Sequence, residues 1–183
     1  MVCGFSSSGT FAYIASAPFV FITLYKVPTE RFGWLFGSVA IGMVVAAQIN
    51  GRMSHKIALW RVLRTANLVQ LAAGLLLLAS VVTGIGGMFG VYAGVFVYVS
   101  AQGFVFPNGS AIAMMRHGDI AGTASALLGT NQFLIAAIMT TFLGFIDNPA
   151  LPMALVIAGS AIASTSLNFL TLGRKLETAP VTA

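Results

Sequence analysis

Charged residues are scarce in this 183-residue sequence: Asp, Glu, Lys and Arg make up 7% of it, whereas hydrophobic residues make up 58%. A soluble domain uses roughly 25% charged residues to cover its surface, so a soluble globular fold is excluded. A net charge of +5 would indicate nucleic-acid binding in a soluble protein, but in a membrane protein it is typical of basic cytoplasmic loops. We therefore expect a lipid bilayer around the chain and no nucleic-acid partner.

Residues that carry chemistry are also few. The single cysteine, Cys3, excludes a disulfide within the chain, and the two histidines lie in separate basic loops without other metal ligands nearby. The acidic residues Glu30, Asp119, Asp147 and Glu177 all lie in predicted loops or in the tail. Nucleophilic catalysis needs a nucleophile, a base and an orienting group that converge, and no such set is present. The sequence predicts no enzyme activity, no cofactor and no metal site.

Long apolar segments are what the sequence has in abundance. A transmembrane helix needs about 20 mostly apolar residues. Charges, prolines and glycine clusters divide the chain into six such segments, at about 2–25, 32–51, 62–82, 88–115, 121–145 and 151–172. We therefore predict an all-α integral membrane protein, with a six-helix transmembrane domain over residues 1–173 and a short cytoplasmic tail over 174–183.

Basic residues fix the predicted orientation. The connections after the second, fourth and sixth spans carry Arg52, Lys56, Arg61, Arg64, Arg116, Arg174 and Lys175. The other side of the membrane carries only Lys26 and Arg31. Because cytoplasmic loops are enriched in Lys and Arg, both termini are predicted in the cytoplasm.

Polar and aromatic residues near the middle of three spans are candidates for a binding site. Transporter sites lie near the bilayer midplane, and amides or phenols beside aromatic rings suit an amphipathic organic ligand. The candidate cavity residues are Thr10, Tyr13, Tyr98, Gln102, Phe106, Asn131 and Gln132. The other interpretation, interhelical hydrogen bonds that only hold the bundle together, stays open for each of them. Amides nearer the cytoplasmic ends are predicted to be interface or packing residues: Gln48, Asn50, Asn67, Gln70 and Asn168.

Small residues recur at helix-packing spacing in the second, fourth and fifth spans. The rows are Gly33 and Gly37, Gly90 and Gly94, and Ala121, Ser125 and Gly129. Such rows let helix backbones approach closely in lipid, which indicates crowded neighbours for these spans. By contrast, the run Leu75–Leu78 of the third span is predicted to face lipid.

Five segments together carry a resemblance that covers nearly the whole chain. They are Phe11–Phe21 with its Ala-Pro-Phe, Phe32–Gly37, Asn50–Lys56, Pro107–Ala111 and Ala121–Gly129. In the same order, they are similar to five parts of one drug-efflux group. These parts are the seventh helix, the start of the eighth helix, the basic loop after the eighth helix, the tenth helix and the start of the eleventh helix. This group is the bicyclomycin/chloramphenicol-resistance (Bcr/CflA) branch of the major facilitator superfamily. The last segment is the most specific.

The resemblance implies that the chain is the C-terminal six-helix half of a drug-efflux transporter, arranged as two three-helix units. In that superfamily, two halves face each other across a substrate cavity and export drugs by alternating access, against proton entry. The second and fifth helices of a half lie at the boundary between halves. The residues predicted to pack there are Gly33, Gly37, Gly42, Ser125 and Gly129. The resemblance also implies a bacterial-type inner membrane as the location. The expected partners are amphipathic drug-like substrates and an N-terminal six-helix half or a second copy of the chain.

The family's cytoplasmic loop motif is matched at Gly51, Arg52 and Lys56. However, His55 stands where the motif prefers Asp, and Ala58 where it prefers Gly, so no gating role is expected for this loop. The family's proton-coupling carboxylates are usually in the N-terminal half, and this chain has no acidic residue at membrane depth. A non-transporting fragment or assembly subunit that only packs with partner helices stays the alternative. A channel is disfavoured, because no span carries a continuous polar stripe.

Overall fold

The computed structural model describes residues 1–54, 56–115, 121–141 and 150–172, and every regular element in these ranges is helical. The elements are α1 (Val2–Ala17), the π-helical segment η1 (Pro18–Leu24), α2 (Thr29–Met53), α3 (Leu59–Thr83), α4 (Gly87–Met114), α5 (Ala121–Thr141) and α6 (Ala150–Leu172). With α1 and η1 forming one span, six helices in the described ranges are long and apolar enough to cross a membrane. The predicted all-α membrane fold is confirmed.

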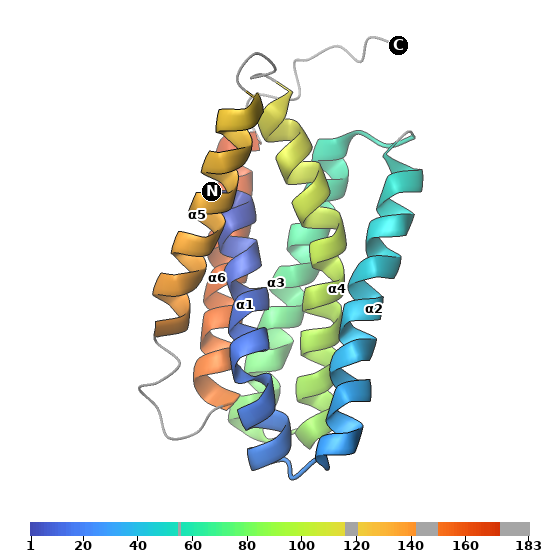
Figure 1. Cartoon of the computed structure of the whole chain (residues 1–183), viewed down its shortest axis with the longest axis vertical. Helices are drawn as coiled ribbons and strands as arrows, with labels where there is room; N and C mark the ends of the chain where they lie inside the picture. The colour runs from blue at the N-terminus through green and yellow to red at the C-terminus, as the bar shows by residue number, and fades with distance from the viewer. Residues whose placement is uncertain (55, 116–120, 142–149, 173–183) are drawn as a thin grey trace.

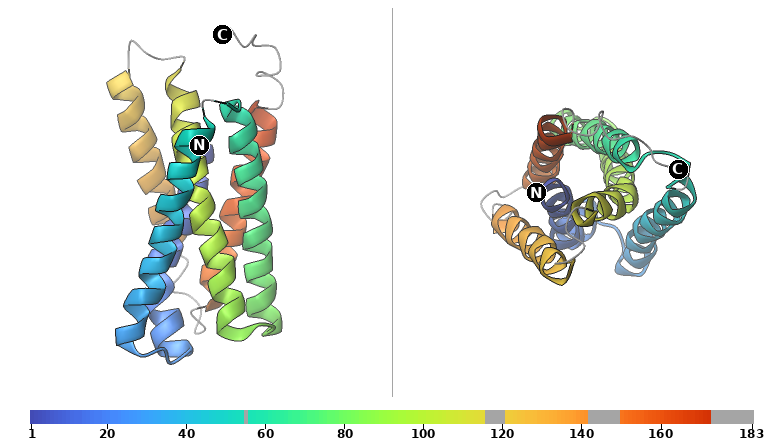
Figure 2. Two further views of the ribbon diagram at one scale, coloured as in Figure 1. Left: turned by 90° about the vertical axis from the view of Figure 1, so that its right-hand side faces the viewer. Right: turned by 90° about the horizontal axis from the view of Figure 1, so that it is seen from above.

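Four helices, α1, α6, α3 and α4, form the centre of the bundle, with α2 packed on α4 and α5 packed on α1 (Figures 1 and 2). The packing is symmetrical between the first three helices and the last three. Helix α1 packs on α5 and α6, just as α4 packs on α2 and α3. Internal repeats of this kind are typical of secondary transporters. The bundle therefore consists of two equivalent three-helix units, as predicted.

The contact between α3 and α4 depends on a glycine. A Cβ on Gly94 of α4 would lie 2.8 Å from the Cβ of Leu77, so only a residue without a side chain allows this approach. Leu77 is fully buried there, whereas Leu75 and Leu76 are exposed. The prediction that the leucine run faces lipid is therefore right for Leu75 and Leu76 and wrong for Leu77, because the 3.6-residue period of a helix turns part of any such run inward.

The first span ends in a π-helical turn that the sequence did not predict. Pro18 begins this segment, and it has no backbone N–H with which to continue the α-helical pattern. At the end of the segment the Tyr25 backbone N donates to the Val20 carbonyl over 3.1 Å. The turn places Phe21 in the core beside the rings of Tyr25 and Tyr92, with ring centroids 6.3 and 6.5 Å apart. It thereby ties the end of the first span to α4.

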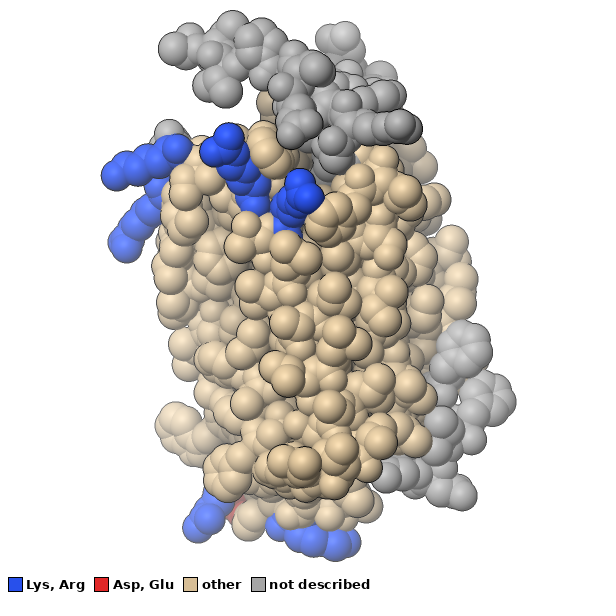
Figure 3. Space-filling view, turned by 180° about the vertical axis from the view of Figure 1, so that it is seen from behind, with Lys and Arg blue, Asp and Glu red and all other residues tan. Residues whose placement is uncertain are grey.

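Charged side chains gather at the two ends of the bundle and leave a broad uncharged band between them (Figure 3). The end where α2 finishes and α3 begins carries Arg52, Lys56, Arg61 and Arg64, and the opposite end carries Lys26, Glu30 and Arg31. An uncharged band is what the hydrocarbon core of a bilayer requires. The described residues thus repeat the basic asymmetry of the sequence, and the side of the membrane on which each end lies stays a prediction.

Candidate functional site

The candidate site lies on the face that α2 and α5 frame. Helices α1 and α4 run between these two flanking helices, with α6 and α3 behind them (Figure 1). In this arrangement α2 packs mainly on α4 and α5 packs mainly on α1, and much of the surface of both helices stays uncovered. The polar residues of α1 and α4 therefore decide what this face can bind.

Tyr98 and Gln102 lie inside the bundle, 0% and 6% exposed. The side-chain oxygen of Gln102 accepts from the Ser6 hydroxyl and from Gln70 Nε2, the latter over 2.9 Å. Gln102 Nε2 donates to the Ser7 hydroxyl over 2.7 Å. Tyr98 Oη donates to the Ser6 carbonyl over 2.9 Å. These contacts join α1, α3 and α4, so the packing interpretation is favoured for both residues, and their predicted role in a cavity gains no support from their position.

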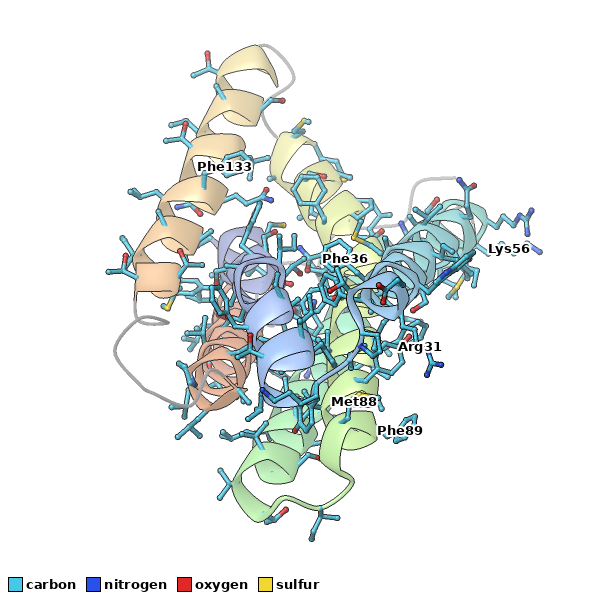
Figure 4. All side chains as sticks on the ribbon, turned by 60° about the horizontal axis from the view of Figure 1, so that its bottom comes forward. Arg31, Phe36, Lys56, Met88, Phe89 and Phe133 are labelled. Carbon is cyan, nitrogen blue, oxygen red and sulfur yellow. The ribbon has the colours of Figure 1, made fainter. Side chains whose placement is uncertain are left out.

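Thr10 and Tyr13, one turn apart on α1, are placed differently. Both hydroxyl oxygens are buried, and neither has a hydrogen-bond partner among the described residues. The Tyr13 ring stacks on Phe36 of α2 at 5.5 Å between centroids, and Figure 4 labels Phe36 on the side of α2 that faces the bundle. A buried hydroxyl without a partner costs about 1–3 kcal/mol. These two hydroxyls are therefore the candidate groups whose hydrogen-bonding capacity the described residues leave unused, and Tyr13 is as deeply buried as Tyr98, 2% exposed.

Asn131 and Gln132 of α5 are both partly exposed. A Cβ on Gly4 would lie 2.5 Å from Asn131 Oδ1, so Asn131 packs against the first turn of α1. Gly4 lies nine residues before Tyr13, roughly 13 Å away along the helix. The midpoints of the spans predict the same depth for Asn131 and Tyr13. The contact with Gly4 instead places Asn131 at a different depth from Tyr13. The register of two packed helices is set by their contacts, and the middle of a span in the sequence does not determine it.

Aromatic side chains remain accessible near the same face. Phe133 of α5 lies 5.4 Å from Phe11 of α1 between ring centroids and is 62% exposed (Figure 4). Phe106 of α4 is 42% exposed. Apolar and aromatic walls with a few polar groups are typical of sites for drug-sized ligands. The role predicted for Phe106 stays a prediction, and Phe11 and Phe133 join it as candidates that the sequence analysis missed.

The small residues assigned to the boundary between halves fall into two groups. A Cβ on Gly33, Gly37 or Gly129 would meet nothing within 4 Å, and Ser125 is exposed, its hydroxyl 3.6 Å from the sulfur of Met114. These positions therefore face outward from the chain. The prediction that Gly42 lies at the boundary between halves is wrong, because a side chain there would collide with Ser100 and Phe96 of α4. Five residues after Gly37, the helical period has turned Gly42 to a different side of α2.

The loop-motif residues Gly51, Arg52 and Lys56 are exposed where α2 ends. The Ser54 hydroxyl donates to the Gly51 carbonyl over 3.0 Å and closes the last turn of the helix. His55, which departs from the family motif, lies outside the described residues. These contacts give the loop a local structural role, and they show no partner for its basic side chains.

Most of the predicted packing amides do pack between helices. Asn50 of α2 accepts from Asn108 of α4 over 2.6 Å, and Asn67 of α3 accepts from Ser164 of α6 over 2.8 Å. Asn168 is also buried, whereas Gln48 is exposed, as the interface alternative of the prediction allows. Within the described ranges no group of three His, Cys, Asp or Glu residues is placed to hold a metal ion. The chemistry available at this face is therefore hydrogen bonding and apolar contact.

Comparison with known proteins gives two relatives. The chain is 28% identical over 174 residues to a bicyclomycin resistance protein homolog of Haemophilus influenzae, a match that covers 94% of this chain and 44% of that protein. It is 30% identical over 162 residues to an uncharacterised MFS-type transporter of Bacillus subtilis, covering 88% of this chain and 40% of that protein. No protein-family model matches the chain.

The chain thus spans less than half the length of the curated relatives that it matches. The resemblance predicted from the sequence is confirmed: the relatives are a bicyclomycin resistance homolog and a major facilitator transporter, and the likeness covers nearly all of this chain. The six helices in two equivalent units correspond to half of a major-facilitator bundle.

Proposed function

We propose that this major facilitator relative is the C-terminal half of a multidrug efflux transporter, which works by alternating access together with an N-terminal six-helix half. The C-terminal assignment rests on the segments that resemble the seventh to eleventh helices of the family. The drug class rests on the Bcr/CflA resemblance and on the bicyclomycin resistance homolog among the relatives. A cavity wall with hydroxyls among aromatic side chains fits amphipathic organic substrates.

The observation that carries the proposal is the open surface of α2 and α5. Gly33, Gly37 and Gly129 point into open space in the isolated chain. In lipid a small residue gains nothing unless another backbone comes close to it, so these positions fit a surface that a second helical unit covers.

Proton coupling belongs, in this proposal, to the other half. The described residues include one acidic residue, Glu30, and it lies in the first turn of α2, at the end of the bundle. A carboxylate that carries protons through a membrane lies within a span, facing the protein interior or a water-filled cavity. The chain accordingly supplies one wall of the cavity and half of the moving structure.

Drug accumulation in cells tests the proposal. One strain makes this chain alone, a second makes a matching N-terminal half alone, and a third makes both. We expect lower accumulation only in the third strain, with the effect lost when the proton gradient is collapsed. Proton-dependent efflux by the chain alone, as a demonstrated monomer, would contradict the proposal.

The alternative is an assembly subunit that packs with partner helices and moves nothing. The closed hydrogen-bond network around Gln102 favours it, because this half is well packed without a partner. The two functions differ in the third strain. An assembly subunit would form a complex with the N-terminal half and leave drug accumulation unchanged.

A further inference from the structure

An apolar groove runs along α3 and α4 beside the end of α2. The left view of Figure 2 shows the ribbons of these three helices, with α4 between α2 and α3. Both helices pack on α4, which forms the floor. The groove has a volume of about 410 Å³. Its lining residues are Met53 and Ile57, five α3 residues between Arg61 and Val69, and five α4 residues between Phe96 and Phe104. Thr10 and Tyr13 do not contribute to it, so the groove is distinct from the candidate substrate site.

The dimensions of the groove match one lipid chain in one leaflet. The lining on α3 extends from Arg61 to Val69, and eight residues of helix rise roughly 12 Å. The lining on α4 extends over the same length, from Phe96 to Phe104. The hydrocarbon core is about 30 Å thick, so the groove runs over most of one leaflet. Its walls are apolar except for Arg61, Thr65 and Ser100, which suits a hydrocarbon chain and excludes a strongly polar ligand.

The charge at one end of the groove identifies the rest of the ligand. Arg61 lies where the groove reaches the basic end of the bundle, and its guanidinium lies 5.2 Å from the Trp60 ring. Arg52 and Lys56 lie at the same end, exposed. The acidic residue among the described ones, Glu30, lies at the opposite end, so no described carboxylate pairs with these cations. A guanidinium is well suited to bind phosphate, and basic pockets beside membrane helices bind anionic lipid head groups.

We propose that this groove binds one anionic phospholipid, with an acyl chain along α3 and α4 beside the end of α2 and the phosphate at Arg61. The site goes beyond the transport function and does not depend on it. The bound lipid fills the groove, and it anchors the start of α3 at the membrane surface. Phosphatidylglycerol is the probe of choice because it carries a net negative charge, and zwitterionic phosphatidylcholine is the control.

Photocrosslinking on the full chain in lipid vesicles tests the site. Phosphatidylglycerol with a photoreactive acyl chain is activated in the membrane, and the labelled peptides are mapped by mass spectrometry. We expect the label to concentrate on residues 62–69 and 96–104. Arg61→Gln should lower this labelling about five-fold, the effect of one basic residue near the membrane surface. Arg31→Gln, at the opposite end, should not change it, and phosphatidylcholine labelling should not respond to Arg61→Gln.

A second pair of variants tests the groove itself. Val97→Trp should fill it and abolish the concentrated label, because Val97 is 43% exposed and lines the groove. Leu76→Trp, on an exposed part of α3 outside the groove, is the matched control. If Val97→Trp, on α4, does not fold, Val69→Trp fills the groove from α3 instead. Even labelling of all exposed helix faces would overturn the proposal, as would equal responses of the two lipids to Arg61→Gln.

Discussion

Replacing Gln102 with Leu should destabilise the bundle rather than alter drug preference. The substitution keeps the approximate size of the side chain and removes two hydrogen bonds, from Gln70 Nε2 and to the Ser7 hydroxyl. It also removes one of the two acceptors, Gln102 and Gln70, that share the single proton of the Ser6 hydroxyl. Interhelical hydrogen bonds in membranes contribute about 0.6 kcal/mol each, so the expected loss is roughly 1–2 kcal/mol. Ser6 and Gln70 keep their own contact of 2.6 Å, so Ser7 is the partner left without its bond. The loss should therefore not greatly exceed this sum.

The assay is reversible unfolding of the purified chain in mixed micelles, followed by far-UV circular dichroism. Tyr98→Phe is the matched control, because it removes one hydrogen bond, to the Ser6 carbonyl, and leaves the ring in place. The loss of unfolding free energy should be about two to three times larger for Gln102→Leu than for Tyr98→Phe. If Gln102→Leu leaves stability unchanged and instead shifts drug preference in a complete transporter, the packing interpretation is refuted.

Three further outcomes are expected. Gly103→Ala should lower the free energy of unfolding by about 1–3 kcal/mol, because the new Cβ would lie 2.5 Å from the Met43 carbonyl oxygen. The control is Gly37→Ala, whose Cβ would meet nothing within 4 Å, and it should unfold like wild type in the same assay. Gly129→Leu should lower drug efflux by the paired halves without lowering the amount of chain in the membrane; equal loss of both would point to a role in folding. Reporter fusions at Lys175 and within residues 27–30 should score on opposite sides of the membrane, and the same side for both would contradict the six-span topology.

The fold could be predicted from the sequence because the signals are local and strong. The length and hydropathy of each apolar segment identify it as a membrane span, and the charged connections mark its ends. The π-helical turn at Pro18 was not predictable in the same way. A proline within an apolar run is compatible with a kink, a break or a π-turn, and the contacts of Phe21 in the core decide among them.

The site was harder to predict because the sequence does not specify which helices face each other. Gln102 and Tyr13 both lie mid-span, yet one is hydrogen-bonded inside the bundle and the other has a hydroxyl without a partner. The link between Gln102 and Ser6 joins residues 96 positions apart, which no spacing rule detects. Gly42 and Gly37 show the same limit, since both are small but only Gly37 faces outward.

The most direct test of the two-half account is a disulfide placed between the halves while efflux is measured. Cys3 is first replaced by Ser. Gly37→Cys on the open face of α2 is then paired with a single cysteine on the facing helix of a co-expressed N-terminal half. The account predicts that oxidation joins the two chains and stops proton-driven drug efflux, and that a reductant restores it. Leu76→Cys, on an exposed part of α3, should not join to the same partner. Efflux that continues unchanged with the two halves joined, or joining at Leu76→Cys as readily as at Gly37→Cys, would contradict the account.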